Sequence, residues 1–109
     1  MKIVTIGCFV LLSLFPSAAQ AYDWMVTVKV TAIEGSYMPV SLPFKIDTAI
    51  GSCPAGTLLN WNVRGADATQ KAQNAQAVLA ILMAAKSSGQ TVTIAGNNAG
   101  CTVDYIYLS

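Results

Sequence analysis

The chain has 109 residues, of which 54% are hydrophobic and only 10% are charged, and its formal net charge is +1. It has no basic patch to hold a phosphate backbone, which argues against nucleic acid as a partner. It also has no histidine and no C-x-x-C pair, so the usual ligands of a zinc site are missing and we expect no metal or other cofactor.

Residues 1–21 have the pattern of a secretory signal peptide. Lys2 supplies a positive charge, residues 3–15 are almost entirely apolar, and Ala19-Gln20-Ala21 matches the small-x-small motif of signal peptidase sites. The apolar run is shorter than the roughly 20 residues needed to span a bilayer, so we expect no membrane span. Cleavage after Ala21 would place a single domain, residues 22–109, in the periplasm or outside the cell.

Two cysteines, Cys53 and Cys101, remain after the signal peptide and Cys8 are removed. In an exported chain such a pair predicts a disulfide, and a small domain with a limited core benefits from one. The charges of residues 22–109 balance, because five basic residues (Lys29, Lys45, Arg64, Lys71, Lys86) meet five acidic ones (Asp23, Glu34, Asp47, Asp67, Asp104).

Three strands are predicted in the first half of this domain. Residues 24–34 and 40–47 alternate between apolar and polar side chains, which is typical of half-buried strands. Pro43 falls on the outward side of the second strand and indicates an edge or a bulge. The third strand, 58–63, carries Trp61, which we assign to the core with Trp24. The inward residues predicted for the first two strands are Trp24, Val26, Val28, Val30, Val40, Leu42, Phe44 and Ile46.

A helix is predicted over residues 66–86, which contain no proline or glycine and are rich in good helix formers. Asp67 is the expected N-cap, and Gly89 is the expected left-handed residue at the C-terminal end. One apolar stripe runs through Ala68, Ala72, Ala75, Leu79 and Leu82. Because Val78, Ile81 and Ala85 widen the apolar arc beyond that stripe, we expect them to be covered by self-association through the helix or an edge strand.

Two more strands follow, at 90–95 and 101–108, with a turn at 96–100 between them. The order is therefore β-β-β-α-β-β. This mainly β pattern with one helix is that of the OB-fold, a small five-stranded barrel.

From residue 24 onward the pattern resembles the B subunits of subtilase cytotoxin and of pertussis-like AB5 toxins. The strongest stretch is 75–94 (A-Q-A-V-L-A-I-L-M-A-A-K-S-S-G-Q-T-V-T-I), and Cys53, Trp61 and Cys101 also suit the pattern. The resemblance implies an OB-fold that forms a pentamer, binds a cell-surface glycan or glycoprotein and carries a toxic A subunit. That family's sugar-site serine comes from a polar segment before the first strand, which this chain lacks, so no residue is carried over for it.

Catalysis needs a base or nucleophile with a tuned partner, and the sequence supplies neither a histidine nor a clustered pair of carboxylates. We therefore expect a non-enzyme.

Exposed aromatic rings and amides suit a sugar-binding surface, because a ring stacks on a pyranose and amides bond its hydroxyls. The predicted ligand-binding residues are Ser36 and Tyr37 in one turn and Asn97 and Asn98 in another. Ordinary turn chemistry also explains the two asparagines, and the rings of Tyr105 and Tyr107 are also explained by packing on a barrel or subunit face. Two functions remain open: a secreted or periplasmic glycan-binding subunit, and a periplasmic inhibitor, immunity or accessory protein acting through protein–protein contacts.

Overall fold

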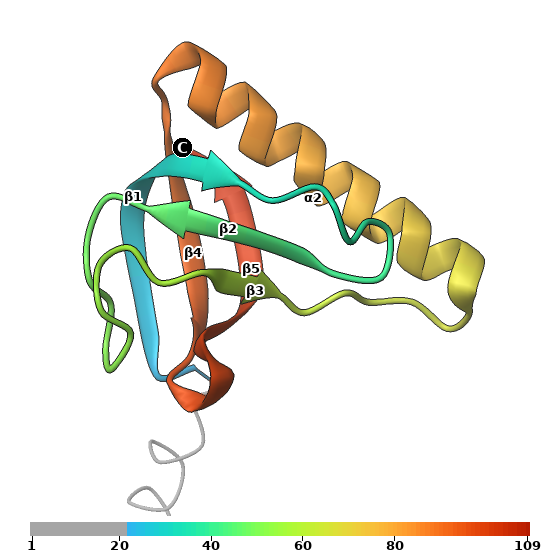
Figure 1. Cartoon of the computed structure of the whole chain (residues 1–109), viewed down its shortest axis with the longest axis horizontal. Helices are drawn as coiled ribbons and strands as arrows, with labels where there is room; N and C mark the ends of the chain where they lie inside the picture. Colours follow the sequence, from blue (N-terminus) through green and yellow to red (C-terminus); the bar gives the residue numbers. More distant parts are fainter. Residues whose placement is uncertain (1–21) are drawn as a thin grey trace, which may run out of the picture.

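The computed structural model describes residues 22–109, and the expected signal peptide, 1–21, lies outside the described residues. Five strands form a closed barrel in the order β1-β2-β3-β5-β4 (Figure 1). The helix α2 crosses one side of this barrel (Figure 1). The elements are β1 (Trp24–Ile33), β2 (Leu42–Ile46), β3 (Leu59–Trp61), α2 (Ala68–Ser88), β4 (Thr91–Asn97), the short 3₁₀ helix η2 (Ala99–Cys101) and β5 (Thr102–Leu108).

The predicted fold class is confirmed in its strand and helix order, its closed barrel and its disulfide. The Cys53–Cys101 bond joins the β2–β3 loop to the end of η2 and closes a loop with a sequence separation of 48. In the chain-entropy model a loop of that size contributes about 4 kcal/mol to stability. The disulfide therefore fastens the two loops at one end of the barrel.

Four of the five strand pairs are antiparallel, and the fifth, the parallel pair of β3 and β5, closes the barrel. The long strand β1 pairs with β4 over its first part and with β2 after a register shift between Val30 and Ala32. Strands β3 and β5 run parallel. Their ladder is short, because only Asn60 and Trp61 of β3 find partners, Thr102 and Val103 of β5.

The core fills the barrel and extends under the helix. Both tryptophans are buried, Trp24 at 8% and Trp61 at 7% exposure, as predicted. The barrel supplies branched and aromatic side chains from every strand, and α2 adds one face made of Ala75, Val78, Leu82 and Ala85. The largest fully buried side chains are Phe44, Leu42, Leu59, Leu82, Ile94, Val92 and Val103.

Both predicted ends of the helix are confirmed. Asp67 is the N-cap, and its carboxylate accepts a hydrogen bond from the Gln70 N–H at 2.9 Å. Gly89 ends the helix in the left-handed region, with φ of 75°, a conformation that costs glycine little. Within residues 22–109, no helix combines the length and the apolar character needed to cross a membrane.

Two details predicted for the second strand are wrong. Val40 is 83% exposed, because β2 begins only at Leu42 and Val40 still belongs to the preceding turn. Pro43 is buried near the start of β2, which pairs with strands on both sides and so is not an edge. The β1–β2 ladder does contain a register shift, but it lies between Val30 and Ala32, opposite Lys45 and Ile46 and not at Pro43. The missing N–H of Pro43 is tolerated there, since the ladder uses the Pro43 carbonyl as acceptor for the Glu34 N–H.

The expected exposed patch on the helix is also wrong. Val78 and Ala85 are 4% and 1% exposed within a single chain, and Ile81 is half-buried. The helix lies with these residues against the barrel, whereas Ala68 at its start is exposed. The apolar arc is wide because the barrel covers it, so it does not call for a second subunit.

Candidate functional site

A groove of about 400 Å³ lies between the β1–β2 loop, the end of β3 and the first turns of α2. This volume falls in the range of small-molecule sites, roughly 300–1,000 Å³. Ligands of OB-folds bind around the second and third strands and the loop between the first two, which is the region of the barrel that this groove borders. Its lining residues are Pro39, Val40, Trp61, Asn62, Val63, Ala68 and Lys71.

The β1–β2 loop forms one wall of the groove. The turn is held by backbone hydrogen bonds from the Val40 N–H to the Tyr37 carbonyl at 3.0 Å and from the Met38 N–H to the Gly35 carbonyl at 3.3 Å. The turn leaves the Val40 side chain almost fully exposed at the rim. An apolar side chain that the fold leaves in solvent is available to a ligand without any rearrangement of the core.

Trp61 contributes to the floor and is fixed from two sides. Its indole Nε1 donates to the Oδ1 of Asn74 on α2 at 2.8 Å, and the same oxygen accepts the backbone N–H of Arg64 at 3.0 Å. The Arg64 guanidinium lies over the indole, 5.6 Å from the ring centroid, within the range of a cation–π interaction. The groove is therefore built on a rigid junction between barrel and helix.

Two polar side chains of the groove keep unused hydrogen-bonding capacity. Asn62 donates from its Nδ2 to the Oδ1 of Asp104 at 2.8 Å, which leaves its own carbonyl oxygen as an acceptor. Lys71 forms no ion pair with any residue of the described part of the chain. A ligand in the groove would meet apolar walls, one ammonium donor and one amide acceptor.

The predicted residues Ser36 and Tyr37 lie in the loop that forms the wall of the groove, although neither is among its lining residues. The Ser36 N–H donates to Glu34 Oε1 at 3.0 Å. Hydrogen bonds from the Ser36 hydroxyl and N–H lower the pKa of the exposed Glu34 carboxyl. Tyr37 is 63% exposed, so its ring is free to reach a molecule held against the loop.

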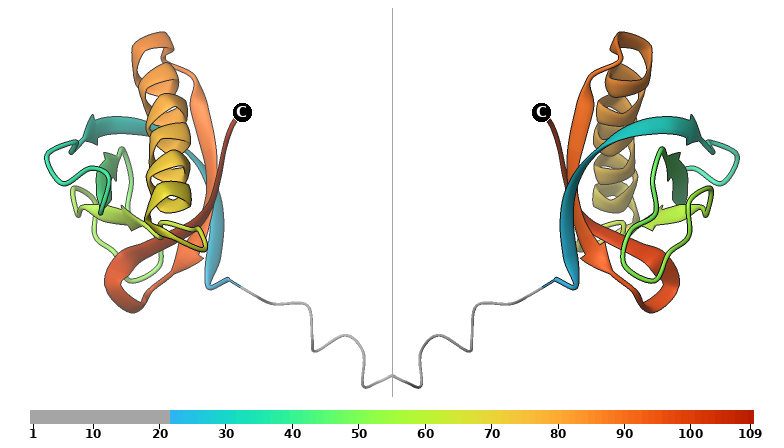
Figure 2. Two further views of the ribbon diagram at one scale, coloured as in Figure 1. Left: turned by 90° about the vertical axis from the view of Figure 1, so that its right-hand side faces the viewer. Right: turned by 90° about the vertical axis from the view of Figure 1, so that its left-hand side faces the viewer.

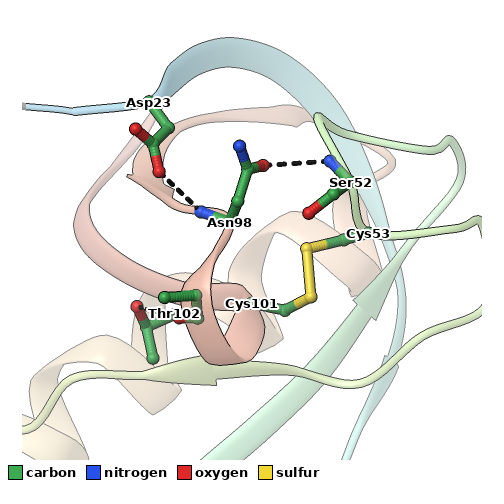
Figure 3. Close-up of a disulfide and its surroundings, with 7 residues drawn as sticks. Asp23, Ser52, Cys53, Asn98, Cys101 and Thr102 are labelled. Carbon is green, nitrogen blue, oxygen red and sulfur yellow. Dashed lines mark hydrogen bonds between the residues drawn. A yellow bond between two sulfur atoms is a disulfide. The ribbon is translucent and has the colours of Figure 1, made fainter.

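The predicted residue Asn98 lies elsewhere, at the end of the barrel that carries the disulfide (Figure 3), and Asn97 is the last residue of β4, directly before it. The Asn98 N–H donates to Asp23 Oδ2 at 2.9 Å, and its Oδ1 accepts the Ser52 N–H at 2.9 Å. The Asn97 amide donates to Asp104 Oδ2 at 2.6 Å. Both asparagines thus make internal hydrogen bonds of the kind that turn chemistry predicts.

The two predicted turns are not brought together. Ser36 and Tyr37 precede β2, whereas Asn98 is bonded to Ser52 in the loop that follows β2. Figure 1 shows the β1–β2 loop beside the start of α2 and the η2 turn at a different end of the barrel. A single site built from all four residues is therefore not formed.

Several groove residues were not predicted from the sequence. Val40 was assigned to the core because it continues the alternation of the second strand. Asn62 and Lys71 carry no recognisable motif, and only the packing of α2 against β3 brings them together.

The five carboxylates of the described chain accept internal hydrogen bonds. Asp104 binds two asparagine amides, Asp67 caps the helix, and Asp23 binds the Asn98 N–H. Asp47 accepts the Lys29 N–H at 3.2 Å, and Glu34 accepts the Ser36 N–H. Within residues 22–109, no three residues of the metal-binding types His, Cys, Asp and Glu cluster closely enough to hold a metal ion.

No protein-family model, curated protein or solved structure matches this chain.

Proposed function

We propose that the chain is an exported, non-enzymatic binding domain that recognises a glycan or glycoprotein through the groove beside the β1–β2 loop. The observation that carries the proposal is the composition of the groove. Exposed Val40 and Pro39 and half-buried Val63 offer apolar contact, and Lys71 and the Asn62 carbonyl offer one donor and one acceptor. A pyranose presents the same combination of an apolar face and a rim of hydroxyls.

Tyr37 adds an aromatic ring to this surface. It is exposed and lies two residues before Pro39 in the loop that forms the groove wall. Stacking of such a ring on a sugar would add affinity without disturbing the barrel, because the ring buries little surface in the free protein.

The non-enzymatic part of the proposal rests on the carboxylates. Each accepts an internal hydrogen bond, and none has a neighbouring histidine, since the sequence contains none. The disulfide that joins the remaining two cysteines of residues 22–109 fits an exported protein. A homo-oligomer and a toxic A subunit belong to the proposal through the resemblance alone, and no number of subunits is proposed from it.

A glycan array probed with the disulfide-bonded domain tests the proposal. We expect binding to a restricted set of sugars, with strong loss for Lys71→Ala and for Val40→Asp. Gly35→Ala is a suitable control in the same loop, because a methyl group there meets no atom within 4 Å. Binding that is equal in all four proteins, or absent in the wild type, would overturn the groove as a sugar site.

A second function, as an inhibitor or accessory protein, is favoured by a different surface. Three exposed side chains lie near one another on the sheet: Met25 (58% exposed), Tyr105 (44%) and Tyr107 (42%). Met25 of β1 and Tyr105 of β5 both pair with Ala95 of β4, and Tyr107 is two residues further along β5. Protein interfaces are enriched in tyrosine and methionine. If no glycan binds, this surface becomes the better guide to the partner.

A further inference from the structure

Strand β5 has a neighbour on both sides only at its beginning. Strand β4 pairs with it along its whole length, up to the pair of Val92 with Leu108. On the other side β3 pairs only with Thr102 and Val103. From Asp104 to Leu108, no strand of the described chain lies along the second side of β5.

The backbone groups on that side can be identified from the ladder with β4. The Ser109 N–H donates to the Thr91 carbonyl at 2.9 Å. Because successive residues of an antiparallel strand direct their backbone groups to opposite sides, Tyr105 and Tyr107 also bond to β4. The N–H and C=O groups of Ile106 and Leu108 therefore point away from the barrel sheet, towards the free edge.

Helix α2 packs against part of β5 and Arg64 protects the start of the edge, but the rest of the edge carries few of the other features that protect one. The Asp104 carbonyl accepts a hydrogen bond from the Arg64 guanidinium, which occupies the edge at its start. Beyond it, residues 105–108 contain no charge and no proline, the features that commonly discourage pairing with another chain. Tyr105, Tyr107 and Leu108 are 38% to 44% exposed, and the end of β5 lies at the margin of the domain (Figure 2).

The sequence along the edge is symmetric about Ile106, with a tyrosine on each side of it. We propose that β5 pairs with β5 of a second copy of this chain in an antiparallel, two-fold arrangement centred on Ile106. In that register Ile106 faces the partner's Ile106, and Tyr105 faces the partner's Tyr107. The unpaired backbone groups then bond across the two-fold axis, as a symmetric dimer interface requires.

The side chains favour this occupant over an unrelated strand. Tyr105 and Tyr107 already make an edge-to-face contact, with centroids 5.5 Å apart. Self-pairing would join four tyrosines into one cluster, and aromatic cross-strand pairs stabilise antiparallel strands. The balanced charge of residues 22–109 does little to oppose association of identical chains. The inference is independent of the groove and stands whether or not the groove binds a sugar.

The experiment measures the mass of the disulfide-bonded domain by sedimentation equilibrium across a concentration series. The wild type is expected to be a monomer–dimer system. The double variant Tyr105→Lys, Tyr107→Lys places like charges opposite each other twice and should raise the dimer dissociation constant by about tenfold or more. The double variant Tyr105→Lys, Tyr107→Glu places opposite charges in those pairs and should restore dimerisation in this register only.

Met25→Lys is the control, because it adds a positive charge to an exposed position of the same sheet on β1, away from the free edge. It should leave the dimer intact. Amide exchange gives a second measurement that needs no variant: protection of the Ile106 amide should rise with protein concentration, while the Tyr105 and Tyr107 amides stay protected throughout. The proposal would be overturned if sedimentation showed a monomer at all concentrations or a pentamer. It would also be overturned if the exchange rate of the Ile106 amide did not change with protein concentration.

Discussion

The indole Nε1 of Trp61 on β3 donates a hydrogen bond to the Oδ1 of Asn74 on α2 at 2.8 Å. Asn74 accepts a second bond from the Arg64 N–H at 3.0 Å. One side-chain oxygen therefore fixes the end of β3, the segment after it and the helix relative to one another. The groove is formed by these three segments with the β1–β2 loop, so its shape depends on this contact.

Replacing Asn74 by alanine should lower the free energy of unfolding by about 1–3 kcal/mol, because the partly buried Trp61 donor loses its acceptor. Asn74→Asp keeps an oxygen at the same place and should cost much less. Urea unfolding followed by tryptophan fluorescence measures both. Equal stabilities for the two variants would contradict the role of the hydrogen bond.

The disulfide prediction concerns the end of the barrel away from the groove. Cys101→Ser should lower the free energy of unfolding by about 2–5 kcal/mol, which is a large part of the stability of so small a domain. Thermal unfolding of the exported variant and the wild type compares them. An unchanged melting temperature would mean that the bond between the two loops contributes little.

Asn98→Ala should cost stability and leave ligand binding unchanged. The substitution leaves the Ser52 N–H without its acceptor, at a cost of about 0.5–1.5 kcal/mol for one exposed hydrogen bond. Because Asn98 does not line the groove, we expect the Asn98→Ala variant to bind the glycan with the same affinity as the wild type. Tyr37→Ala should behave in the opposite way, with lost affinity and nearly unchanged stability. A loss of affinity in Asn98→Ala without loss of stability would return Asn98 to the binding site.

Gly96→Ala should be strongly destabilising. A methyl group at this position in β4 would lie 2.6 Å from Cη2 of the buried Trp24 and would also meet the backbone carbonyl of Thr102. Since backbone cannot move aside as a flexible side chain does, we expect a loss of about 1–3 kcal/mol. Gly35→Ala, in open space, is the control and should change the unfolding midpoint little. If Gly96→Ala and Gly35→Ala have the same unfolding midpoint, the packing argument for Gly96 is wrong.

The sequence allowed the barrel to be predicted where local rules govern. The alternation in β1, the Asp67 cap and the Gly89 terminus depend on neighbouring residues, and all three are present in the structure. The alternation failed at Val40, where a turn replaces the strand. The predicted exposed patch on the helix was wrong because the barrel buries Val78 and Ala85. These outcomes depend on which segments pack together, and periodicity carries no information about that.

The candidate site was less predictable for the same reason. Loop composition pointed to Tyr37, but Asn62 and Lys71 come together only through the packing of α2 beside β3. Asn97 and Asn98 have the composition of a ligand site, and their amides instead bond Asp104 and Ser52. An amide that completes a turn cannot be told from one that binds a ligand until its partners are placed.

The most direct test of the binding account is a titration of the isotope-labelled domain with a glycan panel, followed by NMR of its methyl groups. The account predicts shifts confined to the methyl groups of Val40, Val63 and Ala68, which line the groove. It also predicts an affinity reduced about tenfold or more in Lys71→Ala, the loss of one hydrogen bond from a charged donor. Shifts centred on Met25 instead, or no shift at Val40 with any sugar of the panel, would contradict it.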